Sequence, residues 1–229
     1  TPNLCPGADT GITVVPGAAS RLIVVLPTQY LVPGKTVYPY GVAGEISTQT
    51  AGVYFNATAY AADSRYNRVY GIAKSNIRAT ADDPFYPAIG FYTMTDGSAT
   101  VTNIALRTAG TRSLTFADLS GTSPSLGSTV SGGFTLNPTN PTRLRAMVPG
   151  ESRVPGSTGN GRSGTPVAQQ AGSSFTVTVD ITDSFWNLTP GASQEIRLVC
   201  DDPFSSVVPA SQVITGSATF TVTPIRAGQ

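Results

Sequence analysis

The side chains best suited to chemistry in this sequence are acidic and amide residues that stand at matching places in its two halves. Carboxylate and amide oxygens are the ligands that calcium takes in proteins, so each half could gather them at one end of its fold for a calcium ion. Asp and Asn also shape turns by bonding to the nearby backbone, and the sequence favours this second interpretation. The candidate calcium ligands are Asp63, Asn67, Asp82, Asp83, Asp183, Asn187, Asp201 and Asp202.

Catalytic chemistry has little support in the sequence. There is no histidine, which removes the usual general base, and two distant cysteines exclude a thiolate zinc cluster. Asp9-Thr10-Gly11 matches half of an aspartic-protease signature, whose chemistry needs a second carboxylate that no other such triplet supplies. Gly156–Ser163 looks like a phosphate-binding loop, but Pro155 before it and Pro166 after it do not suit the required strand and helix. We expect no enzyme activity and, calcium aside, no cofactor.

One half of the chain repeats the other. Ile196–Phe204 matches Ile77–Phe85 with six of nine residues identical, at an offset of 119. Upstream, Arg21 pairs with Arg143 at an offset of 122, so the two halves align with only small gaps. An internal repeat of this length predicts two similar structural units.

The apolar residues recur with the period of a strand. Phe55–Ala61 and Phe175–Ile181 alternate polar and apolar side chains, and no stretch shows the spacing of an amphipathic helix. Only 12% of the residues are charged, and Gly and Pro are frequent. We expect an all-β chain of two tandem Greek-key sandwiches, each of about seven strands. The expected divisions are an extension over 1–18, a first domain over 19–138 and a second, incomplete domain over 139–229.

Turn and core residues recur in both halves as a recognisable set. They are Val32-Pro33-Gly34 and Val154-Pro155-Gly156, Gln49–Gly52 and Gln169–Gly172, Asp183–Asn187, the two Asp-Asp-Pro steps, Gly216–Thr219 and Thr108–Thr111. This set resembles bacterial immunoglobulin-like repeats (Big or invasin-like), which stand in tandem in secreted and cell-surface proteins. The resemblance covers most of the chain and implies immunoglobulin-like sandwiches in a secreted, extracellular or cell-surface protein. Because it rests on fold-determining positions, it bears more on fold than on function.

The overall charge and hydropathy narrow the range of partners. A net charge of +1 gives no electrostatic basis for binding nucleic acid or an anionic membrane. The longest apolar run, Leu22–Leu26, is far shorter than the roughly 20 residues of a membrane span. The absence of a methionine at Thr1 fits a removed signal segment or a trimmed chain equally well.

The two ends of the chain complement each other in the repeat. After Leu106 the first half continues into Thr111–Asp118, which alternates as a strand does, whereas the second half has no such continuation. Residues 11–16 align with residues 133–138, the closing strand of the preceding domain in a tandem array. We therefore predict a donor strand, which another copy of the chain receives in its incomplete second domain. The rival explanation is that the chain is a segment of a longer tandem protein. The donor residues are Ile12, Thr13, Val14 and Val15.

The cysteines bear on the same prediction. A donated strand would bring Cys5 near Cys200 of the receiving copy, which makes an intermolecular disulfide a candidate. The alternative is one buried and one idle thiol. One difficulty is that the first half has two strands after Leu106, and one donated strand replaces only one of them.

These inferences favour a non-catalytic extracellular structural protein, a subunit of a cell-surface filament or layer assembled head to tail from copies of the same chain. The alternative is a segment of a tandem adhesin that binds a surface protein or glycan. Tyr38-Pro39-Tyr40 is then the aromatic cluster to test.

Overall fold

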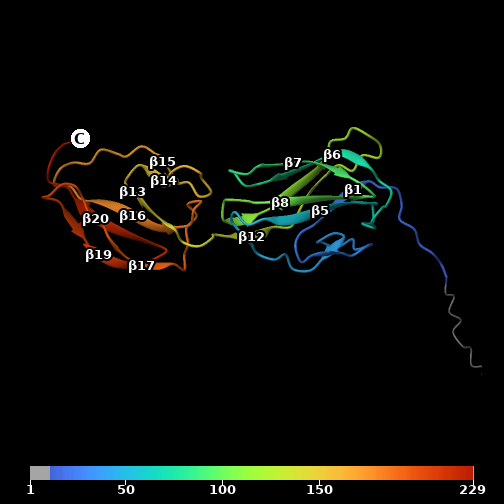
Figure 1. Ribbon diagram of the computed structural model, residues 1–229, viewed down its shortest axis with the longest axis horizontal. Helices are drawn as coiled ribbons and strands as arrows, with labels where there is room; N and C mark the ends of the chain where they lie inside the picture. Colours follow the sequence, from blue (N-terminus) through green and yellow to red (C-terminus); the bar gives the residue numbers. More distant parts are fainter. Residues whose placement is uncertain (1–10, 229) are drawn as a thin grey trace, which may run out of the picture.

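A computed structural model describes residues 11–228 as an elongated molecule built of strands, with no helix among these residues. The prediction of an all-β chain is confirmed. We call β1–β12 the first unit and β13–β20 the second unit (Figure 1). The strands of the first unit are β1 (Arg21–Val25), β2 (Tyr30–Leu31), β3 (Val42–Ala43), β4 (Gln49–Thr50), β5 (Phe55–Ala62), β6 (Lys74–Ala81), β7 (Ala88–Met94), β8 (Ser98–Ile104), β9 (Gly110–Arg112), β10 (Leu114–Asp118), β11 (Ser128–Val130) and β12 (Phe134–Asn137). Those of the second are β13 (Arg143–Met147), β14 (Glu151–Arg153), β15 (Arg162–Gly164), β16 (Phe175–Thr182), β17 (Ser193–Arg197), β18 (Ser206–Val208), β19 (Ser211–Thr215) and β20 (Ser217–Thr223).

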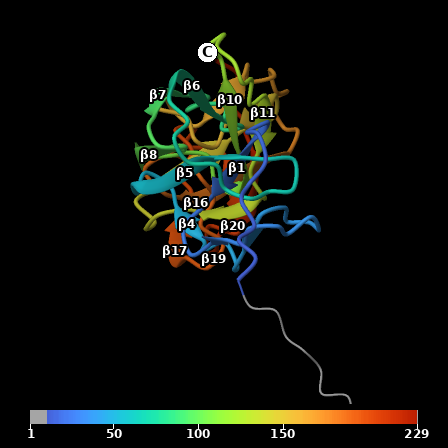
Figure 2. The same cartoon turned by 90° about the vertical axis from the view of Figure 1, so that its right-hand side faces the viewer.

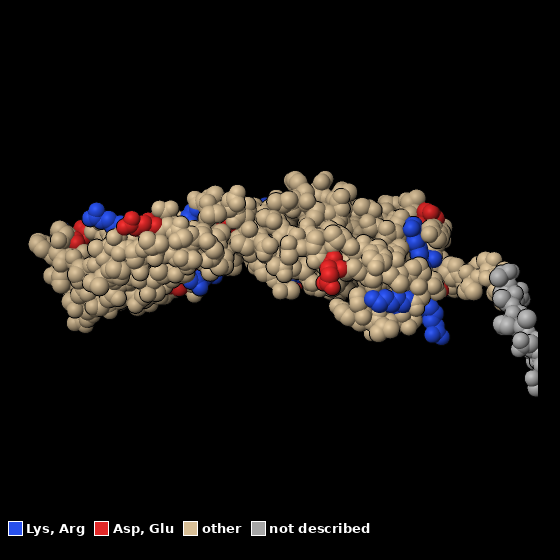
Figure 3. All heavy atoms as spheres, turned by 90° about the horizontal axis from the view of Figure 1, so that it is seen from below, with Lys and Arg blue, Asp and Glu red and all other residues tan. Residues whose placement is uncertain are grey.

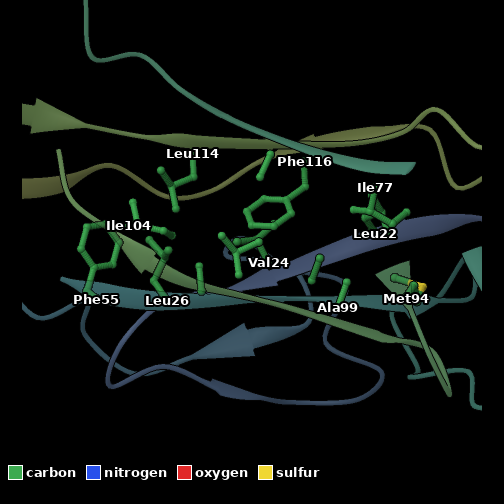
Figure 4. Packing of buried hydrophobic residues seen from close by; sticks show 14 of the residues in the cluster. Leu22, Val24, Leu26, Phe55, Ile77, Met94, Ala99, Ile104, Leu114 and Phe116 are labelled. Carbon is green, nitrogen blue, oxygen red and sulfur yellow. The ribbon is translucent and has the colours of Figure 1, made fainter. Parts of the chain in front are cut away.

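The first unit is a sandwich of two main sheets. One has the order β1-β5-β8 and the other β11-β10-β6-β7. Alternation turns every second side chain of a strand inward, so Leu22 and Val24 from the first sheet face Ile77 and Phe116 from the second (Figure 4). Phe116 and Ile77 are fully buried in this core.

A third sheet closes the side of the first unit. Its order is β4-β12-β9, with β12 parallel to β4 and antiparallel to β9. Phe134 and Leu136 of β12 point into the core and are 3% and 1% exposed. The last strand before the second unit is therefore an integral part of the first.

The second unit repeats only part of this plan. Its sheets have the orders β13-β16-β20-β18, β17-β19 and β14-β15. The pairing of β13 with β16 repeats that of β1 with β5, since Leu144 faces Ile181 as Leu22 faces Ala61.

The counterparts of β9 to β12 are absent from the described second unit. In the first unit β6 lies between β7 and β10, whereas β17 pairs with β19 alone in the part of the chain that the structure covers. Gln49 and Thr50 pair with β12, but their counterparts Gln169 and Gln170 are exposed and belong to no described strand. One side of the second unit is consequently open.

The stretch from Ser120 to Gly133, rich in Gly, Ser and Thr, is held against the strands of the first unit. It contains β11, which pairs with β10. The ammonium group of buried Lys74 donates to the carbonyl oxygens of Thr122 and Pro124 at 2.6 Å each. Lys74 also lies 3.5 Å from the carboxylate of Asp118. This buried cation fixes the loop against β6.

A β-bulge displaces the repeat by one residue near the end of β8. Between Phe55 and Ala57 the register of β5 with β8 shifts, and Asn103 takes a positive φ of 60° there. The second unit pairs Phe175 directly with Val222, without the shift. Beyond this point the structural offset is therefore 118, one less than the sequence alignment gives.

Charged side chains are sparse on the face shown in Figure 3, where Lys, Arg, Asp and Glu lie scattered among uncharged atoms. Within residues 11–228, no helix is long and apolar enough to cross a membrane.

Candidate assembly interface

Each unit has an aspartate that holds the chain segment entering that unit. Asp183 Oδ2 accepts from the backbone N–H of Thr139 at 3.0 Å, and Oδ1 accepts from the backbone of Phe185 and Asn187. Asp63 does the same with Gly17 N–H at 2.8 Å. In both units the following asparagine side chain donates to the same carboxylate. These bonds fix the direction in which the chain enters each sandwich.

The bonds also favour the ionised form of Asp63. Burial opposes ionisation, but hydrogen bonds from the Asn67 side chain and from the backbone of Gly17, Asn67 and Arg65 outweigh it and lower the pKa of Asp63 to about 2. Asp63 is thus an acceptor for backbone N–H groups, as the turn interpretation expects.

We expect Asp63 to contribute to stability in a pH-dependent way. Because its pKa is lowered in the folded chain, the contribution is present above about pH 4 and is lost as the pH falls through about 2. Thermal unfolding followed between pH 5 and pH 2 should show a falling midpoint, and Asp63→Asn should flatten part of that slope. Asp82→Asn is the control, because this carboxylate is exposed and accepts hydrogen bonds from Ser113. Equal slopes for wild type and Asp63→Asn would contradict the assignment.

The other acidic candidates lie at the opposite end of each unit. Asp83 accepts from the backbone N–H groups of Arg107 and Thr108, and Asp202 accepts from those of Ile225 and Arg226. The eight-residue strand β6 separates Asp63 from Asp82 and Asp83.

The two acidic pairs of each unit are therefore not gathered at one end, as the calcium alternative requires, whereas the favoured turn interpretation fits their hydrogen bonds. Asp183 and Asn187 are likewise separated from Asp201 and Asp202 by β17. Across residues 11–228 no three Asp, Glu, His or Cys side chains are grouped to hold a metal ion. The carboxylates of Asp63, Asp83, Asp183 and Asp202 instead accept hydrogen bonds from backbone N–H groups of turns and of the ends of chain segments.

The two units meet through a side-chain clamp on the backbone. The amide of Asn187 accepts from Ala109 N–H at 2.9 Å and donates to the Arg107 carbonyl at 2.8 Å. Asn187 is only 1% exposed. Two bonds to one short segment fix both the distance and the orientation of the units.

Two close contacts complete this junction. A Cβ on Gly156 would lie 2.0 Å from Thr108 Oγ1 and about 3 Å from the Phe85 ring, so the turn of the second unit sits directly on the first. A Cβ on Gly52 would lie 2.5 Å from the Phe185 ring. We use the word junction for the contacts of Asn187, Gly156 and Phe185 with the first unit.

The predicted donor segment does not pack on its own chain. Residues 11–16 form no strand, and Ile12, Val14 and Val15 are 82%, 86% and 74% exposed. Figure 2 looks along the long axis and shows this segment leaving the strands beside the first unit. The last described residues lie at the other end of the molecule, in the second unit (Figure 1).

An open groove lies on the second unit where the first unit has further strands. In the first unit β10 and β11 pack beside β1, and Leu22 is 3% exposed. Its counterpart Leu144 is 50% exposed. Leu144 lines a hollow of about 320 Å³ on this open side, where the first unit has β10 and β11. Its walls are Pro141–Leu144, Ile181 and Ala192–Gln194.

The remaining candidates fall in different places. Cys200 is half-buried beyond the end of β17, with its Sγ 3.8 Å from Asp201 Oδ1, and forms no disulfide within residues 11–228. Cys5 lies outside the described residues, so the intermolecular disulfide stays a prediction. Tyr38 and Tyr40 are 70% and 48% exposed, so this aromatic cluster lies at the surface of the first unit.

Sequence reasoning did not find a buried ion cluster in the second unit. Asp180 is fully buried and accepts from the guanidinium groups of Arg145 and Arg153, with N–O distances of 2.7 Å. Burial opposes ionisation, but bonds from Arg153, Ser217 and Arg145 lower the pKa of Asp180. The sequence did contain a signal of this cluster, because the first-unit residues aligned with Arg145, Arg153 and Asp180 are apolar or aromatic. They are Ile23, Leu31 and Tyr60.

Neither a model of a known protein family nor a curated protein matches this chain.

Proposed function

We propose that this chain is a non-catalytic structural subunit of a secreted or cell-surface filament or layer. Its copies join head to tail when residues 12–15 of one copy enter the second unit of another. The strand order of the first unit supports an immunoglobulin-like plan, with β1-β5-β8 facing β11-β10-β6-β7 and with a parallel β4 beside β12. The described second unit repeats the pairing of β1 with β5 and of β5 with β8 as β13 with β16 and β16 with β20.

The observation that carries the proposal is how the chain enters each unit. β12 belongs to the first unit and leads through Pro138 to Thr139, which Asp183 holds. Residues 12–15 lead in the same way through Pro16 to Gly17, which Asp63 holds. By this analogy the segment over 12–15 belongs to a unit that precedes the first one. In an assembly of identical chains, that unit is the second unit of another copy.

The side chains of the segment suit this place. Ile12 and Val14 align with Phe134 and Leu136, which point into the core, whereas Thr13 aligns with exposed Thr135. In the register of β12, Val14 would lie beside Gln169 as Leu136 lies beside Gln49. Residues 12–15 fill one of the two open strand positions, and the second position lies along the free edge of β17.

Substitution of the inward donor residues tests the proposal. Wild-type chains should form linear oligomers in light scattering and electron microscopy, and Ile12→Asp with Val14→Asp should leave monomers, because buried carboxylates without partners are strongly unfavourable. Thr13→Asp, on the outward face, should assemble as wild type does. Non-reducing electrophoresis of the oligomers would report a bond between Cys5 and Cys200.

Two results would contradict strand donation. One is a stable wild-type monomer at high concentration, which also fits the rival explanation that later residues of a longer chain fill the groove. The other is undiminished assembly of the chain with both aspartates.

A second candidate function is adhesion, with a protein or glycan as ligand. Tyr40 stacks on Tyr66 with ring centres 5.1 Å apart, and the guanidinium of Arg21 lies 4.5 Å from the Tyr66 ring centre. These residues line a pocket of about 230 Å³ with Tyr38. Screening of wild type against Tyr38→Ala with Tyr40→Ala on glycan and surface-protein arrays would test it, and equal binding profiles would reject it.

A further inference from the structure

We propose that consecutive copies make a contact that repeats the junction inside each chain. Asn67 of one copy would clamp the backbone of Ile225 and Ala227 of the preceding copy, as Asn187 clamps Arg107 and Ala109. This inference rests on the proposed head-to-tail assembly and adds which surfaces meet and in which orientation.

The far end of the first unit has the same features that the second unit uses at the junction, but in an exposed state. Asn187 is 1% exposed at the junction, whereas Asn67 is only partly buried. Asn67 keeps the bond to its own Asp63, and in the described chain no group donates to its amide oxygen. Within the described chain, the amide oxygen of Asn67 can thus still accept a hydrogen bond, whereas that of Asn187 already accepts one from Ala109.

The turn beside each asparagine shows the same difference. Gly156 is buried against Thr108 and Phe85, whereas its counterpart Gly34 is exposed. A Cβ on Gly34 would meet only the Asn67 amide oxygen, at 3.5 Å. Both glycines have a positive φ, 77° and 82°, so the two turns present similar surfaces.

The far end of the second unit has the complementary surface. Phe85 is half-buried under the second unit, but its counterpart Phe204 is 70% exposed. Gly52 contacts the Phe185 ring, whereas nothing lies within 4 Å of a Cβ built on Gly172. An exposed phenylalanine next to an open glycine is the surface that Gly156 and Phe185 cover inside the chain.

The backbone that would be clamped is already held in position. Asp83 bonds the N–H groups of Arg107 and Thr108, and Asp202 bonds those of Ile225 and Arg226. With the offset of 118 beyond the bulge, the Arg107 carbonyl corresponds to that of Ile225 and the Ala109 N–H to that of Ala227. Ala227 is exposed, so its N–H group can be reached.

One difference between the two contacts sets the expected strength. Arg65 stands where the second unit has Phe185, so the contact between copies lacks the aromatic ring that packs on Gly52. The contact between copies should therefore be more polar than the junction. In the proposed assembly, each unit is related to the next by nearly the same rotation and translation, whether the two units belong to one chain or to neighbouring copies.

Paired cysteines test the contact in a background with Cys5→Ser and Cys200→Ser. Asn67→Cys with Ala227→Cys should give disulfide-linked ladders of whole chains under mild oxidation. The matched control is Asn187→Cys with Ala109→Cys, which should close within one chain and give no ladder. A disulfide requires Cα atoms within about 7 Å, so it reports the predicted register.

The outcomes separate this inference from the proposed function. Ladders support both. Oligomers that still require Ile12 and Val14 but form no ladder overturn the repeated contact and leave strand donation intact. Absence of oligomers overturns both.

A second measurement does not depend on cysteine geometry. In hydrogen exchange of wild-type oligomers, the peptide that contains Ala227 should become protected relative to the monomeric chain with Ile12→Asp and Val14→Asp. The peptide that contains Ala109 should be protected equally in both. Unchanged exchange at Ala227 on assembly would reject the clamp.

Discussion

Asp180→Ala should destabilise the second unit by about 3–5 kcal/mol, a large part of the roughly 5–15 kcal/mol that stabilises an ordinary domain. Among residues 11–228, Asp180 is the one carboxylate that contacts the buried guanidinium of Arg145, whose side chain is 1% exposed, and the substitution removes it. Arg145 also donates to the carbonyl oxygens of Gly161 and Trp186, which hold it in place. The charge therefore stays buried without its counter-ion.

The first unit provides the matched control for this prediction. Arg145→Ile, Arg153→Leu and Asp180→Tyr together install the residues that occupy the same places in the first unit, where Ile23, Leu31 and Tyr60 lie in one apolar cluster. Replacing a whole buried ion cluster by packed apolar groups is often neutral or stabilising. The triple variant should therefore unfold near the wild-type denaturant midpoint.

Equilibrium urea unfolding, followed by the fluorescence of Trp186 in the second unit, measures both variants. A cost below about 1 kcal/mol for Asp180→Ala would mean that water reaches Arg145 and that the cluster is not desolvated. A triple variant as unstable as the single one would mean that the two units pack differently around these positions.

The strands were predictable from the sequence because their signal is local. In β5 and β16 every second residue is apolar, and turn residues separate the strands. Each strand can therefore be predicted from its own residues, without knowing which strands pair with it. The repeat added long-range information, since matching residues of two halves must take matching places. The open side of the second unit followed from comparing the halves.

The polar contacts were not predictable, because they join residues far apart in the chain. Asn187 bonds Ala109 and Arg107 over 78 and 80 positions, and no local pattern shows which backbone an asparagine will reach. A lysine in a strand is ordinarily exposed, yet Lys74 is buried and donates to the backbone of a loop about 50 residues away. The acidic pairs were candidates for one calcium site in each unit because residue type and repetition show that two positions match, but not at which end of a sandwich each position lies.

The bulge in β8 explains a further error of detail. Alignment by identity keeps one offset through the end of the second half, whereas the additional residue in β8 changes the partners of everything that follows. The residues expected at a contact between copies are therefore Ile225 and Ala227. A bulge has no reliable signature in a single sequence, although asparagine, which Asn103 supplies, takes a positive φ more readily than most residues.

Moving the donor segment to the other end of the chain should convert the assembling protein into a stable monomer. The variant would begin at Pro16 and carry residues 11–18 after Gln229, joined by about 15 Gly and Ser residues. Such a linker has a root-mean-square span of about 20 Å, enough to let the segment reach its acceptor groove, the β12 position beside Gln169 and Gln170, in its own chain. Intramolecular binding at high effective concentration should then exclude other copies.

The self-complemented monomer should also unfold later than the chain with both aspartates. Burying Ile12 and Val14 contributes a few kcal/mol, from which the ordering of the segment is subtracted. A net gain of even about 1 kcal/mol raises the midpoint of a unit of this size by about 4–8 °C. Calorimetry should place this change in the transition of the second unit and leave that of the first unit in place.

The same fusion with Ile12→Asp and Val14→Asp is the decisive control, because linker and length are unchanged. If it melts with the unmodified fusion, the appended segment does not occupy the groove, and strand donation loses its structural basis. If only the unmodified fusion is stabilised, the groove accepts this sequence for its inward side chains. Since the fusion keeps Asn67, Phe204 and Ala227 but has no donor to share, any association that persists must arise from the surface contact alone. Its concentration dependence then measures how much the clamp contributes without the strand.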